Sequence, residues 1–135
     1  MTKILDASAL LAYFEKEPGY EKVRDEFTRA ANYGKNLLMA SVNWGEVVYI
    51  IMREYGEDKA EQIIKLIDTL PIEIAVVGED MAKLAAYYKH KKNLPYADCF
   101  AAALVKMTKG ELLTCDNDFR VLEKEIKINW LKLEG

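Results

Sequence analysis

The sequence predicts an α/β fold in which a mainly parallel β-sheet is covered by helices on both faces. Short apolar runs have the length and composition of strands buried on both sides. Longer segments with a helical period separate these runs from one another. Strands that alternate with helices along a chain are typical of a parallel sheet between helical layers.

The expected strands are the short apolar runs and one alternating segment near the end of the chain. They are Lys3–Asp6, Leu37–Ala40, Glu73–Val77, Leu112–Cys115 and Lys127–Leu131. The last of these segments alternates between polar and apolar residues, so we expect it at an edge of the sheet.

The helices between the strands are predicted from apolar stripes. The stripes run through Tyr20–Ala30, Trp44–Tyr55, Ala60–Leu70 and Met81–Tyr88. The segment Ala97–Met107 is apolar nearly all round, which indicates a buried helix, and Pro95 suits its start.

Length and composition indicate one domain that spans residues 1–135. The chain has 135 residues, of which 51% are hydrophobic and 30% charged, and it contains no linker, repeat or low-complexity segment. A chain of this length buries roughly two-thirds of its unfolded surface, so neither a metal nor a disulfide is needed to hold it together.

Charge and residue counts exclude several classes of protein. The 19 basic and 22 acidic residues argue against coating nucleic acid through bulk charge, but leave room for a local contact path. Two cysteines and one histidine exclude a disulfide framework and the common zinc sites. The longest apolar run, Ala7–Phe14, is too short to span a membrane, and Asp6 interrupts any secretory signal. We therefore expect a cytoplasmic protein with reduced thiols and no membrane partner.

Acidic residues occupy the positions where a parallel sheet binds ligands, beyond the carboxyl ends of its strands. Asp6 ends the first strand and Asp116 follows the fourth. Glu46 lies in the helix after the second strand, and Asp98 lies in the first turn of the apolar helix. Apolar neighbours surround all four residues.

Converging carboxylates in apolar surroundings favour a bound cation. Two carboxylates about 5 Å apart repel each other by roughly 3 kcal/mol at an effective dielectric constant near 20. All-oxygen ligands prefer Mg²⁺ or Mn²⁺ over zinc, and such an ion is suited to phosphodiester hydrolysis. The simpler alternative is also open at this point, because Asp6 or Asp116 alone could cap a helix and Glu46 could pair with a lysine.

Four segments match, in order, the successive acidic motifs of one known family. They read ILDASALLAYF (4–14), SVNWGEVVY (41–49), LPYADCFAAALV (94–105) and ELLTCDNDF (111–119). The chain resembles a PIN-domain protein, in particular a VapC-type toxin ribonuclease of a type II toxin–antitoxin system. The resemblance covers essentially the whole chain.

The resemblance implies a three-layer α/β/α sandwich with a central, mainly parallel five-stranded sheet. It also implies a metal-dependent endoribonuclease that uses Mg²⁺ or Mn²⁺. A metal-activated water would attack the RNA phosphorus and leave 5′-phosphate and 3′-hydroxyl ends. The implied partners are the RNA substrate, a cognate VapB-like antitoxin and a second copy of the chain in a homodimer.

The resemblance also assigns roles to individual residues. Asp6 and Asp98 match the usual metal ligands, Asp116 completes the site, and Glu46 orients a water or binds a second metal. Ser8 and Thr114 match the family's supporting hydroxyls, and Asp118 is an extra acid that some members carry.

Two other functions compete with the nuclease hypothesis. A non-catalytic PIN-like interaction module would use the acids as caps and surface pairs. A phosphatase of the haloacid-dehalogenase type needs a second aspartate two positions after the first, where this chain has Ser8.

Overall fold

A computed structural model describes residues 1–132 and contains a five-stranded sheet with the order β3-β2-β1-β4-β5. Every neighbouring pair of strands is parallel. The strands are β1 (Lys3–Leu5), β2 (Leu37–Ala40), β3 (Ile72–Ala75), β4 (Glu111–Thr114) and β5 (Lys127–Trp130). The predicted parallel sheet is confirmed, and β5 lies at an edge as expected.

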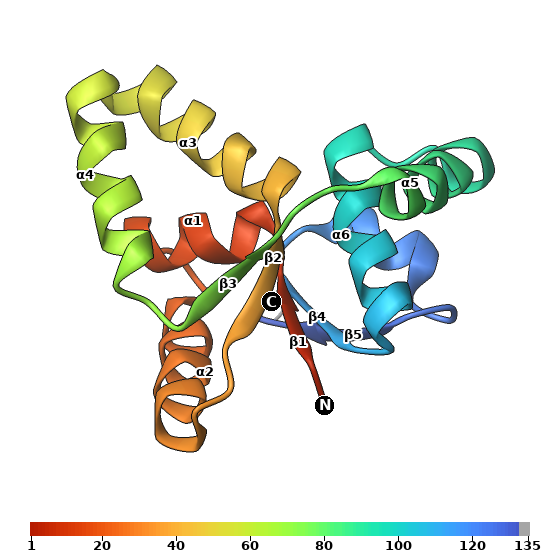
Figure 1. Cartoon of the computed structure of the whole chain (residues 1–135), viewed down its shortest axis with the longest axis horizontal. Helices are drawn as coiled ribbons and strands as arrows, with labels where there is room; N and C mark the ends of the chain where they lie inside the picture. Colours follow the sequence, from red (N-terminus) through yellow and green to blue (C-terminus); the bar gives the residue numbers. More distant parts are fainter. Residues whose placement is uncertain (133–135) are drawn as a thin grey trace.

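Helices pack on both faces of this sheet (Figure 1). They are α1 (Ala7–Glu15), α2 (Tyr20–Tyr33), α3 (Ser41–Tyr55), α4 (Glu57–Asp68), α5 (Glu79–Lys92), α6 (Tyr96–Thr108) and the 3₁₀ helix η1 (Asn117–Leu122). One face is covered by α1 to α4, and the other by α5, α6 and η1. No helix within residues 1–132 is long and apolar enough to cross a membrane.

Successive strand residues point into different cores, which makes the fold a three-layer sandwich. Ile4 and Leu112 belong to the core beneath α5 and α6. Leu5 and Leu113 belong to the core beneath α1 to α4. All four side chains are fully buried, because both faces of the central strands are covered.

The structure departs from the predicted elements at one additional helix and at several strand ends. The apolar run Ala7–Phe14 forms most of helix α1. The third strand ends at Ala75, since the next residue, Val76, is 82% exposed. The fourth strand begins one residue earlier than predicted, at Glu111, whose carboxylate is buried but paired with lysines.

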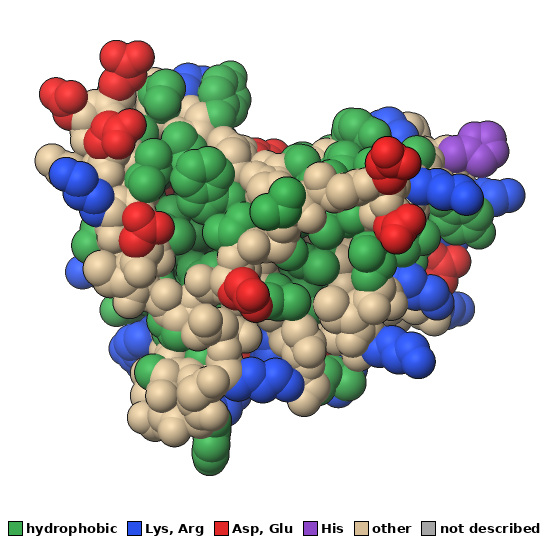
Figure 2. Space-filling view, viewed as in Figure 1, with side chains coloured by type: hydrophobic (Ala, Val, Ile, Leu, Met, Phe, Trp, Pro, Cys, Tyr) green, Lys and Arg blue, Asp and Glu red, His purple; other side chains and the backbone are tan. Residues whose placement is uncertain are grey.

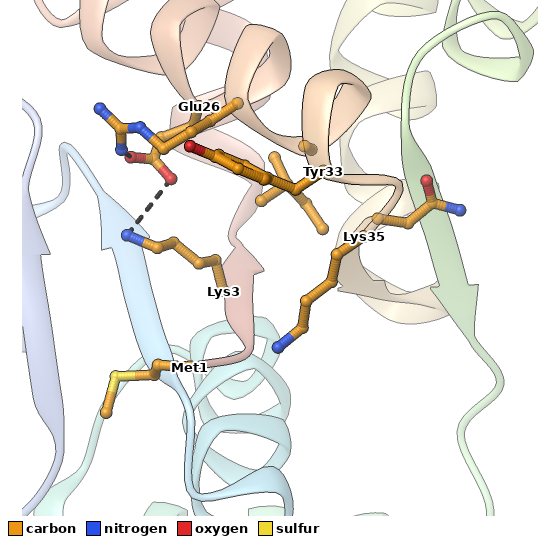
Figure 3. A pocket seen from close by; sticks show the side chains of 9 residues that line it. Met1, Lys3, Glu26, Tyr33 and Lys35 are labelled. Atoms are coloured by element: carbon orange, nitrogen blue, oxygen red, sulfur yellow. Dashed lines mark hydrogen bonds and ion pairs between the residues drawn. The ribbon is translucent and has the colours of Figure 1, made fainter.

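A pocket of about 280 Å³ opens at the amino end of the strands, between β1, α2 and the start of β2 (Figure 3). Beside it lies a partly buried ion network in which Lys3 contacts Glu26 at 3.3 Å and Glu111 at 3.2 Å. Arg29 also pairs with Glu26, and Lys127 pairs with Glu111. Burial alone would raise the pKa of Glu111, but its lysine partners outweigh that effect and hold the pKa below its usual value.

Replacing Lys3 with Met is expected to destabilise the protein by about 2–4 kcal/mol at pH 7, because two buried carboxylates lose a shared cation. The loss should shrink as the pH falls through the depressed pKa of Glu111, since a protonated carboxyl needs no cation. Urea unfolding at pH 7 and pH 3.5 measures both effects. Lys59→Met on the exposed surface of α4 is the control, and equal destabilisation by the two variants would contradict the network's role.

Candidate active site at the carboxyl end of the sheet

Asp6 follows β1 directly, is 2% exposed and caps the amino end of α1. Its carboxylate accepts hydrogen bonds from the Ala9 amide at 2.9 Å, from the Ser8 hydroxyl and from the Thr114 hydroxyl. Burial and, to a smaller extent, the charge of Asp116 raise the pKa of Asp6 to about 6, although the hydrogen bonds oppose this rise.

The hydroxyls of Ser8 and Thr114 connect the end of β1 to the end of β4 through hydrogen bonds. Thr114 accepts a hydrogen bond from the Asp116 amide at 2.9 Å while it donates to Asp6. Ser8 accepts one from the Cys115 amide at 3.0 Å. Ser8 and Thr114 therefore connect Asp6 to the segment that carries Asp116.

Asp98 lies in the first turn of α6 and is 7% exposed. Its Oδ2 atom is buried and has no hydrogen-bond partner among the described residues. Burial, together with the nearby carboxylates of Asp116, Asp6 and Glu46, raises the pKa of Asp98 to about 8. An ionised Asp98 is therefore unfavourable here unless a cation neutralises it.

Asp116 and Asp118 flank the start of η1 and complete a group of three carboxylates. Asp116 caps η1 by accepting a hydrogen bond from the Asp118 amide at 2.8 Å. Asp98, Asp116 and Asp118 can each offer one oxygen, and these oxygens lie within 4.8 Å of one another. That spacing lets one cation contact all three carboxylates.

Glu46 is half-buried on α3, outside this group of three. Burial raises its pKa, and the charge of Asp116 adds to the rise. Glu46 also contributes to the raised pKa of Asp98, so its carboxylate shares their electrostatic environment. Within residues 1–132, no lysine or arginine forms an ion pair with any of the four predicted acids.

The structure thus brings the four predicted acids together at the carboxyl ends of the strands, but their contacts differ. Asp6 and Asp116 do cap helices, as the simpler alternative required, and they face other carboxylates as well. Asp118, given only a supporting part from the sequence, converges with Asp98 and Asp116. The buried residue Asn43 was not among the predicted site residues. It lies three residues before Glu46, which places both on one face of α3.

Three comparisons place the chain among known proteins. The PIN domain family matches residues 3–125. Ribonuclease VapC30 of Mycobacterium tuberculosis is 27% identical over 124 residues, which cover 87% of this chain and 92% of that protein. Among solved structures, DNA-bound VapBC from Salmonella typhimurium superposes with a TM-score of 0.77 at 14% identity, covering 97% and 98% of the two chains. A toxin–antitoxin complex from Klebsiella pneumoniae gives a TM-score of 0.72 at 12% identity, covering 98% and 100%.

Fold and site together define an α/β domain that gathers unpaired carboxylates beyond the ends of parallel strands. With the family match across most of its length, this chain belongs to the PIN domain family.

Proposed function

We propose that the protein is a metal-dependent endoribonuclease and the toxin component of a toxin–antitoxin pair. The observation that carries this proposal is the convergence of Asp98, Asp116 and Asp118 on one point, with a buried Asp98 oxygen that has no donor. The 27% identity to ribonuclease VapC30 supports RNA as the substrate.

The donor set fits Mg²⁺ or Mn²⁺. It consists of carboxylate oxygens, which these hard cations prefer, and contains no thiol or imidazole. Asp98, Asp116 and Asp118 would hold the ion, and Asp6 and Glu46 would add negative charge around it. When bound, a divalent ion lowers the pKa of a coordinated water and neutralises charge on a phosphate.

The chain's own residues then position the reacting groups. Ser8 and Thr114 keep Asp6 ionisable by donating hydrogen bonds to its carboxylate, which lowers its pKa against the effect of burial. Half-buried Glu46 would orient the attacking water. Attack by water rather than by the ribose 2′-oxygen leaves a 5′-phosphate and a 3′-hydroxyl.

An exposed apolar surface on α3 and α4 would receive the antitoxin. Tyr49, Met52 and Tyr55 on α3 and Leu66 on α4 are between 38% and 57% exposed. Figure 2 shows hydrophobic side chains gathered between these helices. An exposed group of this kind is typical of protein-binding surfaces. The toxin–antitoxin complex among the similar structures supports such a partner, and we expect a cytoplasmic homodimer.

The function is tested by incubating the partner-free protein with structured and single-stranded RNAs in Mg²⁺, in Mn²⁺ and in EDTA. We expect internal cleavage with either metal, 5′-phosphate ends, and no cleavage in EDTA. Asp58→Asn, a change of an exposed acid on α4, should leave the rate unchanged.

Two outcomes would contradict the proposal. Cleavage that persists in EDTA, or that leaves 2′,3′-cyclic phosphates, would exclude a metal-activated water. A protein that neither cleaves RNA nor binds Mn²⁺ would instead be the non-catalytic interaction module considered above.

A further inference from the structure

Asn43 is a buried polar side chain that packing alone does not explain. It lies in the first turn of α3 and is 0% exposed. Its Oδ1 atom is buried and has no hydrogen-bond donor among the described residues. An apolar side chain of the same shape would avoid the desolvation cost of that oxygen, so the amide here lowers stability.

The other half of the amide makes a specific contact between two helices. Asn43 Nδ2 donates a hydrogen bond of 3.0 Å to the carbonyl oxygen of Ala97, which is 54 residues away. Ala97 directly precedes Asp98 in the first turn of α6. The hydrogen bond therefore connects α3 to the backbone of α6 one residue before the position that carries the Asp98 side chain.

Asp98 needs such a restraint because its neighbours repel it. Its buried Oδ2 has no hydrogen-bond donor among the described residues, and its carboxylate lies beside those of Asp116 and Asp118. An ionised Asp98 on a loose helix end would move away from them, whereas metal binding needs its oxygen within 4.8 Å of those of Asp116 and Asp118. Asn43 also shares a face of α3 with Glu46. One turn of α3 therefore carries Glu46 and, through Asn43, contacts the turn of α6 that carries Asp98.

We propose that Asn43 is a positioning residue whose carboxamide fixes the first turn of α6 against α3 and thereby holds Asp98 in the carboxylate group. The catalytic consequence of this positioning rests on the proposed nuclease function. The contact itself can be tested without RNA or metal.

Asn43→Leu is the most informative variant, because leucine has nearly the shape of asparagine but lacks its polar atoms. We expect the melting temperature to stay the same or rise, since the unpaired Oδ1 is removed. In the metal-free protein, hydrogen exchange of the amides of residues 98–101 should accelerate about tenfold. The dissociation constant for Mn²⁺ should rise about tenfold, which is the usual effect of losing a group that orients a ligand. With saturating Mn²⁺, kcat should fall while KM for RNA changes less than about twofold.

The matched control is Asn129→Leu, which removes another amide hydrogen bond, that of Asn129 Nδ2 to Glu111 at 3.3 Å. It should leave both the exchange of residues 98–101 and the affinity for Mn²⁺ unchanged. Asn43→Ser provides a second, smaller variant should the leucine variant not fold, and it should weaken Mn²⁺ binding in the same direction.

Unchanged amide exchange and unchanged Mn²⁺ affinity in a folded Asn43 variant would overturn the inference. Faster exchange in a protein whose wild type neither binds Mn²⁺ nor cleaves RNA would support the tie between α3 and α6. That same result would reject the proposed nuclease function, so the two failures are distinguishable.

Discussion

Replacing Asp98 with Asn is expected to reduce RNA cleavage about a thousandfold and to make the metal-free protein more stable at pH 8. The loss of activity corresponds to about 4 kcal/mol of transition-state stabilisation, the scale expected when a charged group proposed to hold a metal becomes neutral. The gain in stability follows because Asp98 is buried among like charges, and the amide has no charge to bury.

The pH dependence of that gain follows from the pKa of Asp98 in the two states. Its pKa is raised from 3.8 to about 8 in the folded protein, so the native state binds a proton more tightly than the unfolded state. The stability that the aspartic acid contributes is therefore complete below pH 4 and is lost as the pH rises towards 8. Since a pKa difference of one is worth about 1.4 kcal/mol, the rise from 3.8 to about 8 means that the asparagine variant should gain about 5 kcal/mol at pH 8.

Thermal unfolding in EDTA at pH 4 and pH 8 provides the measurement. At pH 8, Asp98→Asn should melt about 15 °C above the wild type, and at pH 4 the two should melt together. Asp58→Asn, on exposed α4, should follow the wild type at both pH values. Equal melting temperatures for Asp98→Asn and the wild type at pH 8 would mean that the site does not penalise an ionised Asp98.

Gly110→Ala is expected to destabilise the protein by about 3–4 kcal/mol, which lowers the melting temperature by about 10 °C. A Cβ at this position would lie 2.5 Å from the carbonyl oxygen of Thr2 and 2.7 Å from Ile4 Cδ1. The Thr2 carbonyl accepts the Glu111 amide at 2.8 Å, at the start of the pairing between β1 and β4. The backbone cannot move away from the added methyl group without disturbing the centre of the sheet.

Gly45→Ala is the matched control for that substitution. Gly45 lies within α3, and a Cβ there would have no atom within 4 Å. Alanine favours helix over glycine by about 1 kcal/mol, so this variant should be more stable than the wild type. Urea unfolding of both variants tests the pair, and a Gly110→Ala protein as stable as the wild type would show that the tight contact can relax.

The fold was largely predictable because each strand of the sheet is a short apolar run covered on both sides. Leu37–Ala40 forms β2 with the predicted bounds, and the other strand bounds differ by one or two residues. Two of the errors, at Val76 and Cys115, occur where the apolar pattern continues past the strand. The close approach at Gly110 has no sequence signal, since it depends on where Thr2 lies in space.

The candidate site was predictable only in part, for a similar reason. Positions after strands identify Asp6 and Asp116, because parallel strands end at one edge of the sheet. The sequence does not show that hydroxyl and amide donors surround Asp6 while an oxygen of Asp98 stays unpaired. It also gives no reason to place Asn43 beside Ala97, which is distant in the chain.

The deep burial of α6 limits where a protein of this kind can acquire new binding specificities during evolution. Asp98 and the seven residues after it are all buried, so the helix that presents this acid is also the centre of a core. A substitution at one of those seven other residues removes about 2–5 kcal/mol from a total stability of about 5–15 kcal/mol, so the protein can accept few such changes before it unfolds. The exposed side chains of α3 and α4 carry no such penalty. New binding specificities should therefore arise on those outer helices, while the acidic residues at the carboxyl ends of the strands stay unchanged.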